Sequence, residues 1–226
     1  MSECIKNECT TPTRGRTLDY AAGMYDILSP PMTFWQEKRL GRVAVELLQL
    51  QGNEKIIDIG CGTGSLTIAI GQKLNPEKGG LAVGVDAASK MILRARQKEV
   101  GLKQVQFDIA AAEQLGYPDE TFDKAISTFF FHHVDYELKV TALNEMWRVL
   151  KKGGKAAIVD VDVPTNWFGK LCAWSGYILF RQEEIRENIE GKLRQAFTAS
   201  QFGCYKLVSS HQGYISIFIL QKGHSK

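Results

Sequence analysis

A glycine-rich stretch at residues 55–66, KIIDIGCGTGSL, has the composition of a nucleotide-binding turn. Three isoleucines in its first half favour a buried strand. Three glycines then alternate with other residues, at Gly60, Gly62 and Gly64. Glycine is needed where the backbone adopts a conformation, or approaches a neighbour, in a way that a Cβ would forbid. A helical pattern follows, so the stretch predicts a strand, a turn and a helix that could hold a nucleotide.

Two acids near this turn indicate which nucleotide it is. Asp86 ends the second apolar run, 22 residues after Gly64, where a carboxylate can accept both hydroxyl protons of a ribose. Asp58 lies close to the turn, where it could meet an ammonium group. A dinucleotide site would have a third glycine at position 65, where this chain has Ser65. S-adenosylmethionine offers the diol and the ammonium without a pyrophosphate. The alternatives are a tight turn in another α/β domain and an exposed Asp86.

Two groups of ring side chains are candidates for work on an acceptor. His132 and His133 follow the fourth apolar run, and an imidazole can take a proton near neutral pH. The alternative for the pair is a purely structural role in shaping the loop. Tyr20 and Tyr25 could close over the methionine part of the cofactor, or simply pack a helix near the N-terminus.

These residues must be positioned by a layered sheet. Apolar runs spaced by helical segments predict parallel strands with helices on both faces. The runs are Lys55–Ile59, Leu81–Val85, Val105–Ile109, Lys124–Thr128 and Lys155–Val161. Two closing runs, Tyr205–Ser209 and Tyr214–Leu220, are four residues apart and predict an antiparallel hairpin. The expected fold class is α/β, a Rossmann-like three-layer sandwich with a seven-stranded, mostly parallel sheet.

The sequence pattern predicts one domain with two additions. Residues 1–16 are expected to be a flexible tail, and residues 17–226 a single domain. Within it, residues 17–50 predict an N-terminal helical cap and residues 164–200 an inserted helical lid. The sequence Lys152-Gly153-Gly154 is expected to end the last crossover helix.

Composition excludes several classes of protein. The 226 residues are 44% hydrophobic and 23% charged, which is typical of a soluble globular domain. A formal charge of +3 is too small to argue for nucleic acid. No apolar run approaches the roughly 20 residues of a membrane span, and the polar start lacks a signal-peptide pattern. We therefore expect a cytoplasmic protein.

The cysteines are odd in number and dispersed, at Cys4, Cys9, Cys61, Cys172 and Cys204. This favours free thiols over a disulfide framework or a zinc site. No metal site is expected. A thiol relay for a soft metalloid would require the fold to gather Cys61, Cys172 and Cys204.

The motifs in their order resemble those of class I S-adenosylmethionine-dependent methyltransferases. The matching segments are IIDIGCGTG, VGVDAASKMILRA, LGYPDETFDKAIS, FFFHHV and EMWRVLKKGGKAAIVD. The resemblance runs from about Tyr20 to Val161 and implies S-adenosyl-L-methionine as cofactor, with S-adenosyl-L-homocysteine as product. The implied cofactor-binding residues are Tyr25, Asp58, Gly60, Cys61, Gly62, Gly64, Asp86, Ala87, Met91, Ala112, Glu113 and Thr128. Ala111 stands where the family commonly has an adenine-contacting Asp, so adenine recognition passes to Ala112 and Glu113.

One branch of the family is more similar than the others. The segment YDILSPPMTFWQEKR resembles the ubiquinone/menaquinone-biosynthesis C-methyltransferases (UbiE-like, methyltransferase type 11). This implies a small, apolar or aromatic acceptor such as a quinone. Tyr20, Trp167 and Trp174 are the candidate residues of the acceptor pocket. The segment 167–180 is also a candidate for peripheral contact with a membrane surface.

Two alternatives remain open at the level of sequence. One is the metalloid methyltransferase that would use the cysteines. The other is a non-catalytic scaffold that keeps the fold and binds partners through its aromatic segment. The intact glycine turn and Asp86 argue against the scaffold.

Overall fold

The computed structural model describes residues 11–13, 36–99 and 101–223. Seven strands form one sheet in the order β3-β2-β1-β4-β5-β7-β6. They are β1 (Lys55–Ile59), β2 (Leu81–Asp86), β3 (Val105–Ile109), β4 (Phe122–Thr128), β5 (Leu150–Val161), β6 (Lys206–His211) and β7 (Ile215–Gln221). β1 to β5 are parallel, and β7 pairs antiparallel with β5 and with β6. The predicted fold class is confirmed.

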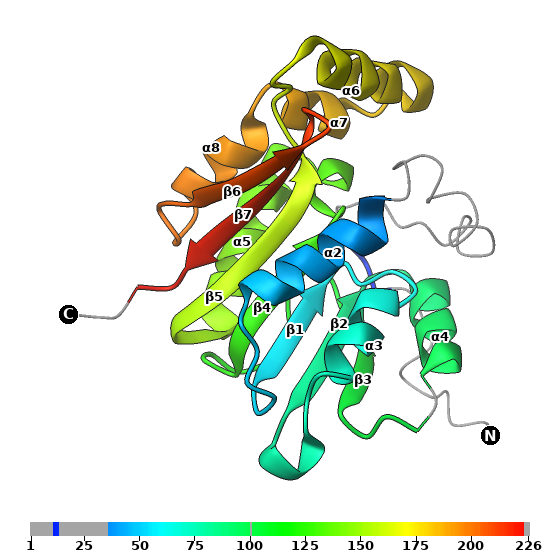
Figure 1. Cartoon of the computed structure of the whole chain (residues 1–226), viewed down its shortest axis with the longest axis vertical. Coiled ribbons are helices and arrows are strands. Elements are labelled where there is room, and N and C mark those ends of the chain that lie inside the picture. Colours follow the sequence, from blue (N-terminus) through cyan, green and yellow to red (C-terminus); the bar gives the residue numbers. More distant parts are fainter. Residues whose placement is uncertain (1–10, 14–35, 100, 224–226) are drawn as a thin grey trace.

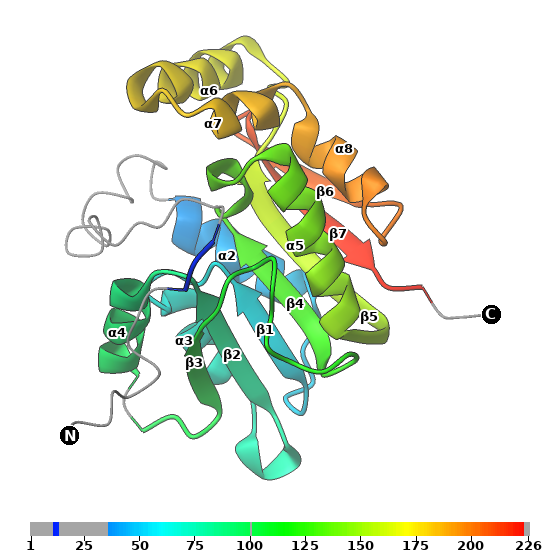
Figure 2. The ribbon, with the colours of Figure 1, turned by 180° about the vertical axis from the view of Figure 1, so that it is seen from behind.

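Helices cover both faces of this sheet. They are α2 (Gln36–Leu47), α3 (Ser65–Gly71), α4 (Ser89–Lys98), α5 (Tyr136–Val149), α6 (Trp167–Phe180), α7 (Glu183–Ile189) and α8 (Lys192–Ala199), with short 3-10 helices η1 (Pro76–Lys78) and η2 (Phe131–His133). α2 and α3 lie in front of the sheet in Figure 1, and α5 and α8 lie in front of it in Figure 2, which is the view from behind.

The strand order reverses between β1 and β4, and this decides where a ligand can bind. In open parallel sheets the crevice outside the carboxyl ends of the strands opens at such a reversal. The loops after β1, β2, β4 and β5 all leave from that edge, and they carry the glycine turn, Asp86 and the histidine pair.

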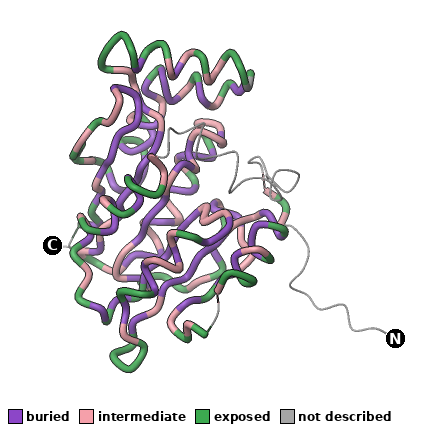
Figure 3. Tube along the Cα trace, turned by 45° about the vertical axis from the view of Figure 1, so that its right-hand side comes forward, coloured by how far each residue is buried: buried purple, intermediate pink, exposed green. Residues whose placement is uncertain are grey.

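Alternation along the strands distributes the core between the two faces. Ile57 and Ile59 of β1 belong to the cluster that packs beneath α5 and α8. Ile56, which precedes them and faces the other side of the sheet, belongs to the cluster that includes Leu40 and Ala44 of α2. The tube in Figure 3 accordingly shows the central strands as buried.

The end of α5 differs from the sequence expectation. Lys152-Gly153-Gly154 does not end this helix, because the helix stops at Val149 and Leu150 is already extended, with φ −74° and ψ 139°. Leu150 is fully buried and pairs with Phe122, so burial starts β5 before the glycines. Gly153, with φ +74°, then lies inside β5 where its register with β4 shifts.

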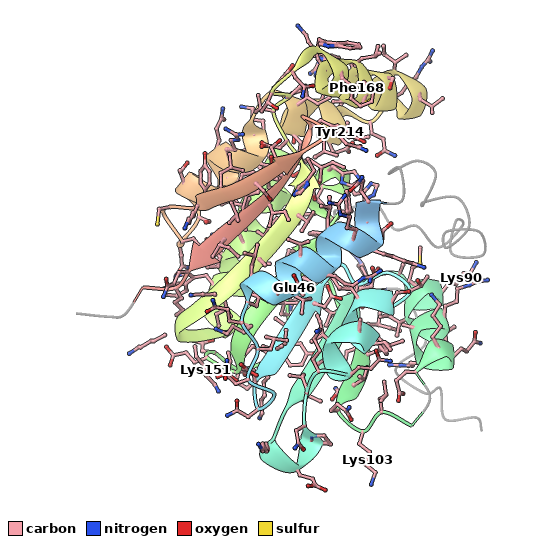
Figure 4. All side chains as sticks on the ribbon, in the orientation of Figure 1. Glu46, Lys90, Lys103, Lys151, Phe168 and Tyr214 are labelled. Atoms are coloured by element: carbon pink, nitrogen blue, oxygen red, sulfur yellow. The ribbon has the colours of Figure 1, made fainter. Side chains whose placement is uncertain are left out.

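The segment 164–200 forms three helices, α6, α7 and α8. α8 packs on α5 through Leu193, Ala196 and Phe197, which belong to the main core. α6 lies at the far end of the molecule, beyond the β6–β7 turn; Figure 4 labels Phe168 on it above Tyr214. No helix in the described ranges is long and apolar enough to span a membrane. Apart from residues 11–13, the predicted tail lies outside the described residues, and so does most of the predicted cap.

Candidate active site

The glycine turn follows the carboxyl end of β1 and is hydrogen-bonded to the carboxyl end of β2. The backbone N–H groups of Gly60 and Cys61 both donate to the carbonyl of Val85, at 2.9 and 3.0 Å. Gly60 and Gly64 have φ of +73° and +75°. A Cβ at Gly60 would meet the ring of Phe130 at 2.6 Å, and one at Gly64 would meet Phe107 at 2.5 Å. Both glycines are therefore required by the fold itself.

Gly62 is different, because no described residue fills the space beside it. Its φ is +53°, and no atom of the described chain lies within 4 Å of the position that a Cβ would take. Its N–H donates to Oδ2 of Asp86 at 3.0 Å. The middle of the turn thus presents open backbone, as expected where a ligand approaches closely.

Asp58 is a buried carboxylate beside this turn, with 1% of its surface exposed. Its Oδ2 accepts a hydrogen bond from the hydroxyl of Thr67 at 2.6 Å. Its Oδ1 has no hydrogen-bond partner among the described residues. Burial raises the pKa of Asp58 to about 7, the Thr67 hydroxyl opposes this, and the charge of Asp86 adds to it. A buried acceptor without a donor fits the ammonium of S-adenosylmethionine.

Asp86 is fixed at the end of β2 by two backbone donors. Its Oδ1 accepts from the N–H of Ala88 at 2.9 Å, and its Oδ2 from Gly62. The carboxylate is partly exposed and lies close enough to Asp58 to affect its pKa. Two carboxylates around an open glycine turn suit a ligand that is cationic and carries a diol, so the residues fit S-adenosylmethionine.

The residues expected around the adenine lie in two loops. Ala87 is partly exposed, and its carbonyl accepts from the N–H of Thr11 at 3.2 Å. Met91 on α4 is 2% exposed. Ala112 is buried, and Oε1 of Glu113 accepts from the hydroxyl of Thr13 at 2.7 Å. The described N-terminal residues therefore touch both of these loops.

A pocket of about 320 Å³ opens beside the second of these loops. It is lined by Thr11, Asp108, Ile109, Ala110, Gln114, Gly116 and Tyr117. Tyr117 donates its hydroxyl to Oδ2 of Asp108 at 2.6 Å, and burial together with this bond raises the pKa of Tyr117. Sequence reasoning missed this pair. Asp108 could have been found as an acid near the end of the third strand, because it lies one position before β3 ends.

Thr128 ends β4, and the histidine pair follows it in η2. His132 Nδ1 lies 2.7 Å from Oδ1 of Asp160, which is fully buried at the end of β5. The ring centroids of His132 and His133 are 4.0 Å apart. Asp160 was also missed, although β4 and β5 are neighbouring parallel strands whose ends must meet. The strand-end rule applied to Asp86 would have found it.

A buried lysine lies behind this loop. Lys139 on α5 has no exposed surface, and its Nζ donates to the carbonyl of Val134 and to Glu187 of α7, the latter at 2.7 Å. Burial lowers the pKa of Lys139, against the opposing effect of Glu187. The lysine ties the loop after η2 to α7.

The aromatic candidates have different surroundings. Trp167 is 78% exposed at the start of α6. Trp174 is partly buried, packs edge-on against Tyr177 at 5.8 Å between ring centroids, and contacts the cluster that includes α2. Tyr20 and Tyr25 lie outside the described residues.

The cysteines are not drawn together within the described part of the chain. Cys61 packs beside α4, whereas Cys172 lies on α6. Burial and the charges of Asp58 and Asp86 raise the pKa of the Cys61 thiol, which disfavours the thiolate that metalloid chemistry needs. No group of three or more His, Cys, Asp or Glu side chains in the described ranges could hold a metal ion.

Known proteins match the chain in family and in fold. Residues 50–207 match a family described as a methyltransferase domain. The ubiquinone/menaquinone biosynthesis C-methyltransferase UbiE of Geobacter sulfurreducens is 30% identical over 82% of this chain and 68% of its own length. The demethylmenaquinone methyltransferase of Listeria welshimeri is 28% identical over 69% of this chain and 66% of its own length. A crystal structure of a SAM-dependent methyltransferase from Aquifex aeolicus superposes with a TM-score of 0.60 at 19% identity, covering 91% of this chain and 99% of that one.

Proposed function

The chain belongs to the methyltransferase-domain family, and on this premise we propose that it transfers a methyl group to a ring carbon of a lipid-soluble quinol. It is an S-adenosylmethionine-dependent enzyme. The sulfonium of that cofactor supplies an activated methyl group, so the protein contributes mainly alignment and, for a hydroxylated ring, removal of a proton. The quinol is proposed because one named relative is a C-methyltransferase of ubiquinone/menaquinone biosynthesis and the other is a demethylmenaquinone methyltransferase.

The unpartnered Oδ1 of Asp58 carries the proposal for the cofactor site. We assign the ammonium to Asp58, the ribose to Asp86, and the approach of the methionine part to the open backbone at Gly62. The adenine is assigned to the space between Ala87 with Met91 and Ala112 with Glu113. Thr128 would lie near the sulfonium, and Tyr20 and Tyr25 are proposed to close the site.

The cofactor assignment is tested at Asp86. Loss of a carboxylate that accepts two hydroxyls leaves both unpaired, so Asp86→Ala should weaken S-adenosylmethionine binding about a hundredfold or more. Calorimetry on folded protein measures this. Asp119→Ala, which removes an exposed carboxylate paired with Arg148, is the matched control and should bind normally. Equal affinity of Asp86→Ala and the control would remove the assignment.

We further propose that α6 brings the enzyme to its acceptor at a cytoplasmic membrane surface. Its outer face exposes five large apolar side chains, at Trp167, Phe168, Leu171, Ile178 and Leu179. The only charged residue within α6 is Lys170, and Arg181 follows at its C-cap. An apolar face with a Trp and flanking cations is typical of helices that lie in the membrane interface. Trp174, on the inner side, is proposed to line the acceptor pocket.

The membrane contact is tested with Leu171→Glu/Leu179→Glu. Each buried Leu contributes about 1.5–3 kcal/mol, so binding to vesicles of phosphatidylglycerol and phosphatidylcholine should fall at least tenfold. Turnover of a long-chain quinol in those vesicles should fall with it, while turnover of a short-chain quinol in buffer should not. Leu207→Glu, an exposed position on the edge strand β6, is the control. Unchanged vesicle binding would contradict the proposal.

The acceptor is tested by product analysis. Wild-type enzyme, S-adenosylmethionine and a 1,4-naphthoquinol without a ring methyl should give a ring-methylated product by mass spectrometry and NMR. A methyl ether, or no methylated quinol beside active transfer to another compound, would contradict C-methylation of a quinol.

A further inference from the structure

His132 is in direct contact with a buried carboxylate, that of Asp160. His132 Nδ1 lies 2.7 Å from Oδ1 of this fully buried carboxylate. The ring of His133 lies against that of His132, tilted by 45° to it. An imidazole fixed through one nitrogen presents the other in a defined direction.

The carboxylate of Asp160 is held by donors from three elements. Oδ2 accepts from the N–H of Phe131 in η2, and Oδ1 accepts from the N–H of Val161 in β5, both at 2.7 Å. Asn188 of α7 places its Nδ2 at 3.5 Å from Oδ1 and donates to the carbonyl of Val161 at 3.1 Å. The carboxylate therefore cannot turn away from the ring without losing buried hydrogen bonds.

This arrangement decides where the proton of a neutral His132 lies. An ionised carboxylate only accepts, so a neutral ring bonded to it through Nδ1 must carry its hydrogen on Nδ1. Nε2 is then the basic nitrogen. It makes no hydrogen bond to any residue that the structure describes, and the side chain keeps 13% of its surface exposed.

We propose that Asp160 is a positioning residue that holds His132 as the Nδ1–H tautomer, and that Nε2 of His132 is the general base of the methyl transfer. This inference rests on the proposed function for the identity of the acceptor, and it adds the residue pair that removes the acceptor's proton. Other charged groups around the pair are Lys139 of α5 and Glu184 and Glu187 of α7. The negative charge of Asp160 acts to raise the pKa of Lys139, against the lowering by burial.

The step balances as follows for a quinol. Nε2 of His132 takes the hydroxyl proton, and electron density moves to the neighbouring ring carbon. That carbon forms a bond to the methyl group while the methyl–sulfur bond breaks, leaving neutral S-adenosylhomocysteine. The methylated carbon then loses its hydrogen as a proton, the oxygen regains one from His132, and one proton is released overall.

The tautomer is tested on the full chain without any acceptor. In ¹⁵N-histidine-labelled protein, NMR should show neutral His132 protonated at Nδ1, with His132→Gln used to assign the signal. Asp160→Ala should release this preference and give a mixture of tautomers. Asp160→Asn, which keeps the volume, serves if the alanine variant does not fold. Asp123→Asn, the same chemical change at the opposite end of β4, should leave the signal unchanged. An Nε2–H tautomer in wild type, or the same tautomer in both Asp160 variants, would overturn the inference.

The catalytic part is tested with acceptors of graded acidity. His132→Gln and Asp160→Asn should lower kcat for the naphthoquinol by about a hundredfold or more, with little change in the KM of S-adenosylmethionine. For a ring-substituted phenol that is already ionised at the assay pH, the kcat of the same variants should be within about tenfold of the wild-type kcat. Equal losses on both acceptors would mean that His132 does not act as the base. If the wild-type enzyme turns over no quinol at all, the proposed acceptor is wrong. The NMR experiment still tests whether Asp160 holds His132 as the Nδ1–H tautomer.

Discussion

Asp58 is the residue at which burial and the proposed ligand binding oppose each other most directly. Its pKa of about 7 in the folded chain, against an ordinary value of 3.8, means that the fold without ligand favours the protonated acid. An ammonium beside the free Oδ1 favours the ionised form instead. The site is therefore arranged so that a cation relieves the cost of the buried charge.

This predicts a stability that falls with rising pH. The folded state holds the Asp58 proton more tightly than the unfolded state, so the contribution is fully present below about pH 4 and is lost as pH rises to about 7. At about 1.4 kcal/mol per pKa unit, the loss is up to about 4 kcal/mol. Asp58→Asn should therefore be more stable than wild type at pH 8 and similar to it near pH 4, in urea unfolding without ligand.

Saturating S-adenosylmethionine should reverse that order at pH 8, because the ionised Asp58 gains a partner and the amide does not. Affinity of the wild type should accordingly rise between pH 6 and 8, while that of Asp58→Asn stays low and nearly flat. If the two proteins keep the same stability difference at all pH values, Asp58 does not titrate near 7.

In the glycine turn the same residue type has a packing role at one position and a proposed ligand-binding role at another. Gly64 is packed against Phe107 and Ala95, whereas Gly62 faces open space. The sequence predicted β1 and β3 at their observed bounds, because apolar runs and turn residues act over short distances. It misplaced the end of α5, because burial of Leu150 against Phe122 is a tertiary contact that local pattern does not contain.

A pair of substitutions should separate these two roles. Gly64→Ala should cost several kcal/mol in unfolding free energy, because its Cβ would meet two side chains within 2.7 Å in addition to the left-handed backbone. Gly62→Ala should cost only about 1 kcal/mol, from its positive φ, yet weaken S-adenosylmethionine binding at least tenfold. Thermal unfolding and calorimetry measure both. Normal cofactor affinity in Gly62→Ala would show that no ligand atom approaches this glycine.

The first turn of α6 is fixed to the turn between β6 and β7, while Ala173 and Trp174 in the middle of the helix pack against the core. Asn166 caps the helix by accepting from the N–H of Gly169 at 2.7 Å, and a Cβ at Gly169 would meet the backbone of Gly213 at 2.3 Å. Two glycines thus allow the helix to sit on the β6–β7 turn while its outer face stays exposed. The sequence pattern identified the apolar helix, but it could not tell which stripe faces solvent, since the helix is apolar around most of its circumference.

At the scale of the whole molecule, the candidate site is a product of topology. Asp58, Asp86 and Asp160 lie near the carboxyl ends of three strands, and His132 follows a fourth; all four lie along one edge of the sheet because these strands are parallel neighbours in the order β2-β1-β4-β5. Sequence reasoning found three of the four from strand ends and motifs. It missed the pairing with Asp160, and it could not place the loop between η2 and α5, because that loop is held by contacts with α7.

Those contacts centre on Lys139, and they yield a prediction about the coupling of α5, α7 and the histidine loop. Glu187→Gln removes the carboxylate charge that pairs with the fully buried ammonium and leaves a neutral amide oxygen in its place, beside the carbonyl of Val134. Breaking a buried pair costs about 3–5 kcal/mol, and because 27% of the Glu187 side chain is exposed we expect the lower part of that range.

Lys139→Met removes the charge and should cost less. The double variant Lys139→Met/Glu187→Gln should then be more stable than Glu187→Gln alone, which a double-mutant cycle in urea measures. Additive losses would mean that Lys139 and Glu187 do not interact, and that this pair does not couple α7 to the loop carrying His132 and His133.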